Sequence, residues 1–270
     1  MDFPEPIPQS EHDASAPTPP PPVPTSGENP VWGLLDVLQI ALVAPLAIIF
    51  SELALSSIAR LITHHTPSAD LYREPLVQIG AQAVVFLAVV GFMLMIVRFK
   101  YDAPFLEAIS WNMPRPGRVA LFVLVGAGMA LFSEGVSWLF SRWIPQSVPF
   151  DEMFRTRSSA FAMMFLGILL APPAEELFFR GFLYPALARR GGAVTSVILT
   201  ASGFALLHAG QLAHAWVPLL VIFTVGIVCT TVRAITKSVA SSVIVHMAYN
   251  STIFAGLLLS TGGFRHLGNP

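Results

Sequence analysis

The sequence predicts an all-α fold: a polytopic integral membrane bundle of about seven transmembrane helices, with six to eight as the range. The chain is 54% hydrophobic and 11% charged, whereas an ordinary soluble domain has roughly 25% charged residues. Its mean hydropathy is +0.67, and apolar runs near the roughly 20 residues that cross a bilayer recur along it. Because these runs lack the apolar and polar alternation of a membrane β-barrel strand, helices are the expected spanning elements.

Composition also predicts how the chain is divided. Residues 1–30 combine many prolines with Ser, Thr, Glu and Asp and contain no Lys, no Arg and no apolar run, so we expect a disordered Pro-rich tail and no signal peptide. Residues 31–262 form the predicted transmembrane helical domain, whose motif-bearing core covers about residues 158–258. Residues 263–270 are a short polar tail.

Polar or proline-bearing connections separate the apolar runs that we expect to cross the membrane. The predicted spans are residues 31–61, 75–97, 119–140, 158–188, 193–207, 215–232 and 239–259. The fifth of these is short for a crossing, and the connection 98–118 is expected to hold a short interfacial helix around residues 103–111. Tryptophans near the predicted ends are expected at the level of the lipid headgroups; they are Trp32, Trp111, Trp138, Trp143 and Trp216.

The distribution of basic residues predicts the orientation. Eight Lys and Arg residues fall in connections on the N-terminal side and six on the opposite side, which favours a cytoplasmic N-terminus. We therefore expect a multi-pass protein, in the inner membrane if the source is a bacterium. The formal net charge of −1 provides no large positive field for nucleic acid. The single cysteine, Cys229, excludes an intramolecular disulfide.

Three charges, Glu175, Glu176 and Arg180, lie inside the apolar segment "APPAEELFFRGFLYPALARR", which ends in two further arginines. A charge at the centre of a membrane helix costs roughly 2.5–3.5 kcal/mol on insertion scales, so each one needs compensation. Glu176 and Arg180 are four residues apart and share a helix face, where they can pair. Glu175 lies about 100° around the helix from Glu176 and needs another partner. The preceding Pro172 and Pro173 are expected to kink the helix and open a cavity beside the glutamates.

Two later apolar helices offer polar partners for Glu175. The segment "FALLH" places Phe204 and His208 on one helix face, and "HMAYN" does the same for His246 and Asn250. Each polar group is unfavourable against lipid but tolerable in a shared, partly hydrated cavity. A carboxylate, two imidazoles and a carboxamide would form an acid/base cluster, in which one group takes a proton, an imidazole shares it and the others donate hydrogen bonds to an oxyanion.

The three motifs resemble those of a known family. "EELFFR" fits Glu-Glu-x-x-x-Arg, "FALLH" fits Phe-x-x-x-His and "HMAYN" fits His-x-x-x-Asn. These are motifs of the CPBP intramembrane protease family, which contains the type II CAAX prenyl endopeptidases; the chain is similar to that family over about residues 158–258. The resemblance implies a glutamate-dependent intramembrane endopeptidase whose partners are the lipid bilayer and a peptide or protein substrate, with membrane-embedded and lipidated substrates included.

The resemblance also implies a role for each motif residue. Glu175 would activate the hydrolytic water with help from His208. His246 and Asn250 would stabilise the tetrahedral oxyanion or polarise the scissile carbonyl. The remaining motif residues would be structural, namely Glu176, Arg180 and Phe204, of which the last would pack near the site.

Other interpretations stay open on the sequence alone. Glu175, His208 and His246 could hold a catalytic Zn²⁺, although the chain has no His-Glu-x-x-His helix and we assign no metal or other cofactor. A non-catalytic membrane scaffold or immunity-type protein of the same family would keep the polar cluster for packing. A proton-coupled transporter is a further alternative, for which no internal repeat is evident.

Three other acidic residues lie in or beside apolar runs. Asp36 and Glu52 are expected to snorkel or to cap helix ends. Glu134 is deeper, and we expect it to line the cavity or to pair with an arginine.

Overall fold

The structure, a computed structural model, describes residues 31–63 and 71–267. The predicted tail at 1–30 and the last residues of the chain therefore lie outside the described part. Within that part every regular element is helical, and six helices are long and apolar enough to cross a membrane. The predicted all-α, polytopic helical bundle is confirmed. The candidate spans are Leu34–Ile58, Pro75–Lys100, Pro116–Leu139, Arg157–Leu207, Trp216–Thr236 and Val239–Ser260.

Most helices begin and end within a few residues of the predicted bounds, because prolines and polar caps mark their ends. The helices α2 (Pro75–Met95) and α4 (Pro116–Leu139) each start with a proline in the first turn, where its missing N–H is no loss. The N-cap of α9 (Val239–Ser260) is Ser238, whose hydroxyl accepts from the amide of Ser241. The remaining long elements are α1 (Leu34–Thr63) and α8 (Trp216–Thr236), and the expected interfacial helix is the single turn α3 (Phe105–Ala108).

The fourth span is a chain of helical pieces. At about 1.5 Å per residue its 51 residues would measure roughly 76 Å, far more than the roughly 30 Å of a bilayer core, so it cannot be one crossing. It breaks at Gly192, whose φ of 72° and ψ of 171° are accessible to glycine, close to the predicted boundary between the fourth and fifth spans. The pieces are α5 (Arg157–Phe165), α6 (Ala171–Glu176) and α7 (Tyr184–Leu207), joined by π-helical turns at Leu166–Leu170 and Leu177–Leu183.

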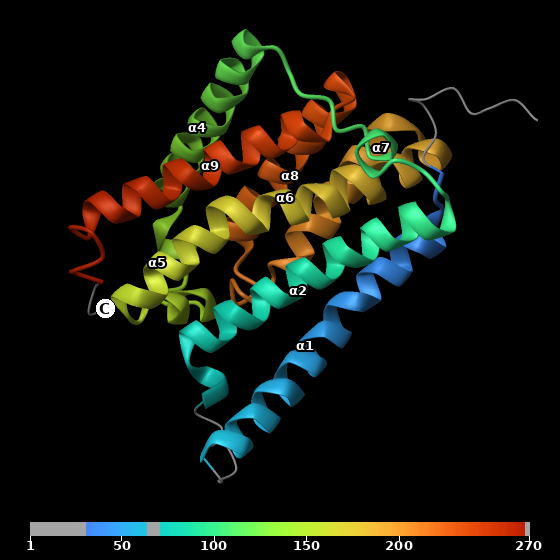
Figure 1. Cartoon of the computed structure of the whole chain (residues 1–270). Coiled ribbons are helices and arrows are strands. Elements are labelled where there is room, and N and C mark those ends of the chain that lie inside the picture. The colour runs from blue at the N-terminus through green and yellow to red at the C-terminus, as the bar shows by residue number, and fades with distance from the viewer. Residues whose placement is uncertain (1–30, 64–70, 268–270) are drawn as a thin grey trace, which may run out of the picture.

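The helices pack in pairs around α9. Figure 1 shows α4 crossing α9, and α1 and α2 side by side; α7 packs on α8, and α9 also contacts α8 and α6. The crossing of α4 and α9 depends on Gly126, where a Cβ would lie 2.3 Å from the carbonyl oxygen of Val245. The backbones therefore touch, as they do at small-residue interfaces between membrane helices.

Trp32, just before α1, is buried in the protein. Its ring is fully buried, and it stacks on Phe182 with ring centroids 4.2 Å apart. Its indole Nε1 donates to the carbonyl oxygen of Phe182 at 3.1 Å. Buried indoles need such an acceptor, so this contact attaches the start of α1 to the π-helical turn at Leu177–Leu183. By contrast, Trp138 is 80% exposed.

Asp36 caps the first turn of α1, as expected, but it also has partners from a distant segment. Its carboxylate accepts from the amide of Gly33 at 2.9 Å, from Nζ of Lys100 at 2.5 Å and from the hydroxyl of Tyr101 at 2.7 Å. Burial, followed by the bond to Asp36, raises the pKa of Tyr101 above its ordinary value. Glu134 is exposed on α4, and no described arginine pairs with it.

Candidate active site

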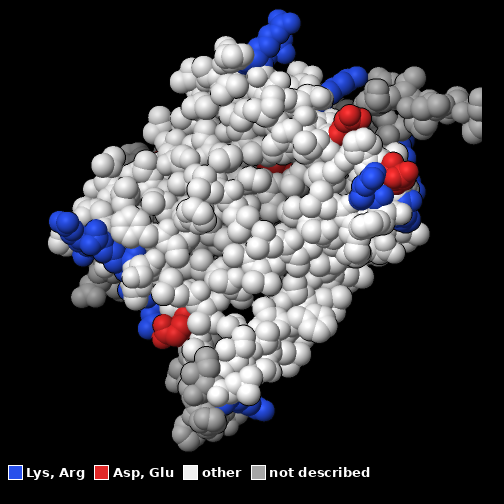
Figure 2. All heavy atoms as spheres, in the orientation of Figure 1, with Lys and Arg blue, Asp and Glu red and all other residues white. Residues whose placement is uncertain are grey.

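The polar motif residues lie on three neighbouring parts of the bundle. Glu175 and Glu176 end α6, and Arg180 follows in the π-helical turn. Phe204 and His208 lie at the end of α7, and α9 carries the other histidine and the asparagine. In Figure 2 one face of the bundle is almost free of charge, with basic and acidic side chains at its edges and a small acidic surface in the middle.

Glu176 and Arg180 form the ion pair that their spacing allows. Nη1 of Arg180 lies 2.7 Å from Oε1 of Glu176, and both side chains are fully buried. Arg180 also donates from Nε to Oγ1 of Thr230 at 3.1 Å and from Nη2 to the carbonyl oxygen of Gly226 at 3.0 Å. The guanidinium carbon lies 4.7 Å from the ring centroid of Phe204. Two acceptors on α8 thus bind N–H groups of the buried guanidinium that Glu176 does not reach. A buried charge requires such hydrogen bonds.

His246 lies between the two adjacent glutamates. Its Nδ1 is 2.9 Å from Oε1 of Glu176, and its Nε2 is 3.9 Å from Oε2 of Glu175. An ionised carboxylate can only accept, so Nδ1 carries the hydrogen and Nε2 is directed at Glu175. The side chain of Glu175 is 18% exposed and that of Glu176 is not exposed at all. The two carboxylates therefore have different environments, and solvent reaches only Glu175.

His208 contacts the same cluster through Phe204. Nδ1 of His208 is 2.9 Å from the carbonyl oxygen of Phe204, which can only accept, so Nε2 is the unprotonated nitrogen of the neutral ring. The ring of Phe204 lies 4.9 Å from His208 and 5.7 Å from His246, measured between centroids. Within the described part of the chain, His208 is not within ion-pairing distance of Glu175, whereas His246 is.

Asn250 bonds to the backbone of the glutamate-bearing segment. Its Nδ2 donates to the carbonyl oxygen of Gly167 at 2.6 Å. In the π-helical turn the amide of Ala171 bonds five residues back to Leu166. The next carbonyl in that register, Gly167, would take its bond from residue 172, which is a proline without an N–H. Asn250 therefore supplies the donor that Pro172 lacks, a relation that the sequence motifs did not predict.

A protein-family model matches the part of the chain that carries these residues. Residues 157–252 match the family model described as Type II CAAX prenyl endopeptidase Rce1-like. Over these residues the chain is similar to that family. No curated protein and no solved structure matches the chain. The Rce1-like segment begins at α5 and ends two residues after Asn250, so it contains all seven motif residues.

The polar cluster does not fit a zinc ion in this geometry. Glu175, His208 and His246 were the candidate ligands, but the described residues contain no group of three His, Cys, Asp or Glu side chains close enough to hold a metal. The ring of Phe204 packs against both imidazoles.

Sequence reasoning missed three residues of the candidate site. Thr230 and Gly226 lie in α8 and hold Arg180, and Gly167 accepts from Asn250. A Cβ on Gly226 would lie 3.0 Å from Ala201, which indicates why a residue without a side chain stands there. Threonine and glycine are common in apolar helices, so residue type alone did not indicate that these three contact the site.

Proposed function

We propose that this Rce1-like protein is an intramembrane endopeptidase that hydrolyses a peptide bond with a water molecule activated by Glu175. The observation that carries the proposal is the partly exposed carboxylate of Glu175, which lies 3.9 Å from Nε2 of His246 inside a membrane-spanning bundle. An ionisable residue at this depth is costly and is usually functional. The family match suggests a protease.

Glu175 is a better candidate for the general base than Glu176. The carboxylate of Glu176 is fully buried and its Oε1 is bonded to Arg180 and to His246. Its charge is therefore used to neutralise Arg180 and to fix the tautomer of the imidazole. Glu175 has neither constraint, and a water about 2.8 Å from both its Oε2 and Nε2 of His246 would fit the gap between them.

In the proposed reaction Glu175 takes a proton from this water, whose oxygen attacks the scissile carbonyl carbon. The carbon–nitrogen bond then breaks, and the proton passes to the leaving amine, so that one water is consumed for each peptide bond. His246 shares the proton across the 3.9 Å gap, and Nε2 of His208 is a further proton acceptor. The second N–H of the Asn250 carboxamide, beyond the one bonded to Gly167, is available to the oxyanion.

The substrate class follows from the location of the site. A cluster within a bilayer-spanning bundle is reached by peptide segments that enter the membrane, whether membrane-embedded or attached to lipid. We therefore propose a peptide or protein substrate of this kind, with the bilayer as the second partner.

A comparison of membrane proteomes tests the proposal. Cells carrying Glu175→Gln should accumulate uncleaved proteins that cells with the unchanged protein process. The matched control is Glu52→Gln, the same substitution at an exposed glutamate of α1, and it should leave processing unchanged. If Glu175→Gln gives the same peptide profile as the control, the protein acts as a non-catalytic scaffold or an immunity-type protein, and the proposal is wrong.

Two further measurements separate the remaining alternatives. Liposomes containing the purified protein should show no solute flux driven by a proton gradient, because flux would indicate a transporter. Cleavage by the purified protein should persist through a chelator titration, because its loss and recovery with Zn²⁺ would indicate a metal-dependent site.

A further inference from the structure

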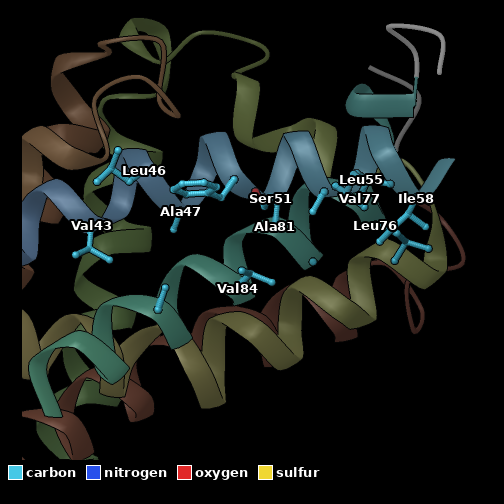
Figure 3. Close-up of a pocket in the computed structure, with 14 residues that line it drawn as sticks. Val43, Leu46, Ala47, Ser51, Leu55, Ile58, Leu76, Val77, Ala81 and Val84 are labelled. Atoms are coloured by element: carbon cyan, nitrogen blue, oxygen red, sulfur yellow. The ribbon is translucent and has the colours of Figure 1, made fainter. Parts of the chain in front are cut away.

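The groove between α1 and α2 offers little to a charged or polar ligand. It has a volume of about 790 Å³, and none of the motif residues lines it (Figure 3). Its lining side chains are apolar except for Ser51, whose hydroxyl already donates to the carbonyl oxygen of Ile48 at 2.8 Å. Polar side chains with unused hydrogen-bond donors lie elsewhere, where the last turn of α8 packs beside the start of α7.

Arg233, in the last turn of α8, is a buried cation without an acidic partner among the described residues. The residue is 8% exposed, and its Nε donates to the carbonyl oxygen of Arg180 at 3.2 Å. Its Nη1 and Nη2 donate to no described residue. A buried charge that lacks a partner is costly, so an anion bound at these two nitrogens would stabilise the guanidinium.

Tyr184, the first residue of α7, supplies a further donor to the same region. Its side chain is buried, and its phenol interacts electrostatically with Arg233. Its hydroxyl bonds to no residue in the described part of the chain. Neither this hydroxyl nor the two Nη nitrogens of Arg233 are fully enclosed, although all three lack a partner. The two side chains therefore present three donor groups that a small anionic group can reach.

A chain of contacts links Arg233 to the candidate active site. Its Nε bonds to the backbone of Arg180, and the guanidinium of Arg180 pairs with Glu176 at 2.7 Å. Tyr184 in turn follows Arg180 by four residues, about one helical turn. A group bound at Arg233 and Tyr184 would thus lie one turn beyond the buried ion pair.

The depths of Arg233 and His246 differ by a short distance along the bundle. Helix α8 ends at Thr236 and α9 begins at Val239, so a link of two residues holds these helix ends at a similar level. Arg233 is three residues before its helix end and His246 is seven residues after the start of its helix. At 1.5 Å per residue these depths are about 4.5 Å and 10 Å. Arg233 therefore lies about 6 Å closer to the link than the imidazole that faces Glu175.

We propose that Arg233 and Tyr184 bind a carboxylate of the peptide substrate and thereby help to select the bond that is cleaved. This inference rests on the proposed endopeptidase function. The two Nη groups can donate to both oxygens of a carboxylate, and the phenol can add a third bond. An extended peptide advances about 3.3 Å per residue, so 6 Å corresponds to about two residues. The carboxylate is thus expected about two residues from the scissile bond, as an acidic side chain or as the end of the chain.

The burial of both side chains favours a peptide over a lipid as the source of the anion. Arg233 and Tyr184 are 8% and 7% exposed, so the opening above them is narrow. A carboxylate on an extended peptide is small enough to enter it, whereas a lipid phosphate carries two ester groups and stays at the level of the headgroups. The contact with Arg180 also joins this site to the cluster that the peptide must reach.

Cleavage of matched synthetic peptides by the full-length protein tests the proposal. The peptides span a cleavage site found in the proteome comparison. An acid peptide keeps its carboxylates near the scissile bond, and amide peptides replace the acidic side chains or the terminal carboxylate one at a time, which identifies the source. The unchanged protein should cleave the acid peptide with a KM about tenfold lower than that of one amide peptide, at similar kcat. Arg233→Gln should abolish this preference by raising the KM of the acid peptide alone.

Two further variants complete the test. Tyr184→Phe removes one donor without changing the charge and should reduce the preference about threefold or more, which keeps the test open if Arg233→Gln does not fold. The matched control is Arg190→Gln, at an exposed arginine of α7, which should keep the full preference. Thermal unfolding checks that each variant is folded.

The outcomes separate this inference from the proposed function. Cleavage of the acid and all amide peptides with equal KM, or an equal rise in KM for both kinds of peptide in Arg233→Gln, would overturn this inference alone. Loss of phosphatidylglycerol binding in Arg233→Gln, with the peptide preference unchanged, would identify a lipid site and would also overturn it. Cleavage of no peptide by the unchanged protein would overturn the proposed function and this inference with it.

Discussion

The Nε2 atom of His246 lies 3.9 Å from Oε2 of Glu175, and Nδ1 of the same ring is 2.9 Å from Oε1 of Glu176. One imidazole thus joins the solvent-accessible carboxylate to the buried ion pair. In serine hydrolases and zinc enzymes a carboxylate behind an imidazole fixes its tautomer and orientation. By the same argument Glu176 positions the ring of His246. Substitutions at the neighbouring site residues should therefore have unequal effects on activity and stability.

Substitution of His246 by Gln should lower kcat by about 10²–10⁴, the usual contribution of a group that transfers protons. Glutamine keeps the size and a hydrogen-bonding amide but cannot share a proton with Glu175. The measurement is the steady-state cleavage of a substrate peptide found in the proteome comparison. The control is His266→Gln, at an exposed histidine after α9. This substitution should leave kcat unchanged. Normal turnover by the His246 variant would remove this ring from the mechanism.

Two i,i+4 ion pairs among the described residues should respond differently to loss of their arginine. Arg180→Met leaves Glu176 charged and buried, so the free energy of unfolding should fall by about 3–5 kcal/mol. Arg98→Met removes the partner of Asp102, an exposed pair with side chains 65% and 91% accessible, and should change stability little. Denaturant titration in mixed micelles measures both. Equal losses would contradict the assignment of Arg180 as the centre of a buried network.

A methyl group at Gly126 should destabilise the crossing of α4 and α9. The added Cβ would be 2.3 Å from the carbonyl oxygen of Val245 and 2.8 Å from the Cβ of Ala248, so backbone would have to move. Overpacking of this kind costs roughly 1–3 kcal/mol or more. The control is Gly128→Ala on the same helix, which meets nothing within 4 Å and should gain a little helix propensity. A melting temperature for Gly126→Ala at or above that of the control would contradict the close packing.

The bond from Asn250 to Gly167 should be coupled energetically to Pro172. Asn250→Ala leaves the carbonyl of Gly167 without a donor and should cost about 1–3 kcal/mol. Pro172→Ala restores an N–H that can reach this carbonyl, so the cost of Asn250→Ala should be smaller in that background. A double-mutant cycle on the free energy of unfolding measures the coupling. Additive losses would mean that Asn250 does not compensate for the proline, and would leave an oxyanion role as its main function.

Cleavage assays on the unchanged protein, Asn250→Ala, Pro172→Ala and the double variant distinguish the two roles of Asn250. If the carboxamide of Asn250 only donates to the carbonyl oxygen of Gly167, cleavage activity and stability should both recover in the double variant. If its second N–H also donates to the oxyanion, kcat should remain low although stability recovers.

The sequence alone determined the membrane class, the helix positions and the motif residues. Long apolar runs without alternation can satisfy their backbone only as helices in lipid, and prolines and serines mark several of their ends. The pairing of Glu176 with Arg180 also follows from local geometry, because residues four apart share a face. These properties depend on neighbours along the chain, which the sequence displays directly.

Only the tertiary structure decided which distant groups meet. The indole of Trp32 contacts Phe182, 150 positions away, and Asp36 is held by Lys100, because these helices pack side by side. Likewise His246, which comes from α9, lies between the two glutamates of α6, while the ring of His208 packs against Phe204. Contacts of this kind depend on how helices cross and on where a glycine lets backbones touch, so they arise from the packing of the whole bundle.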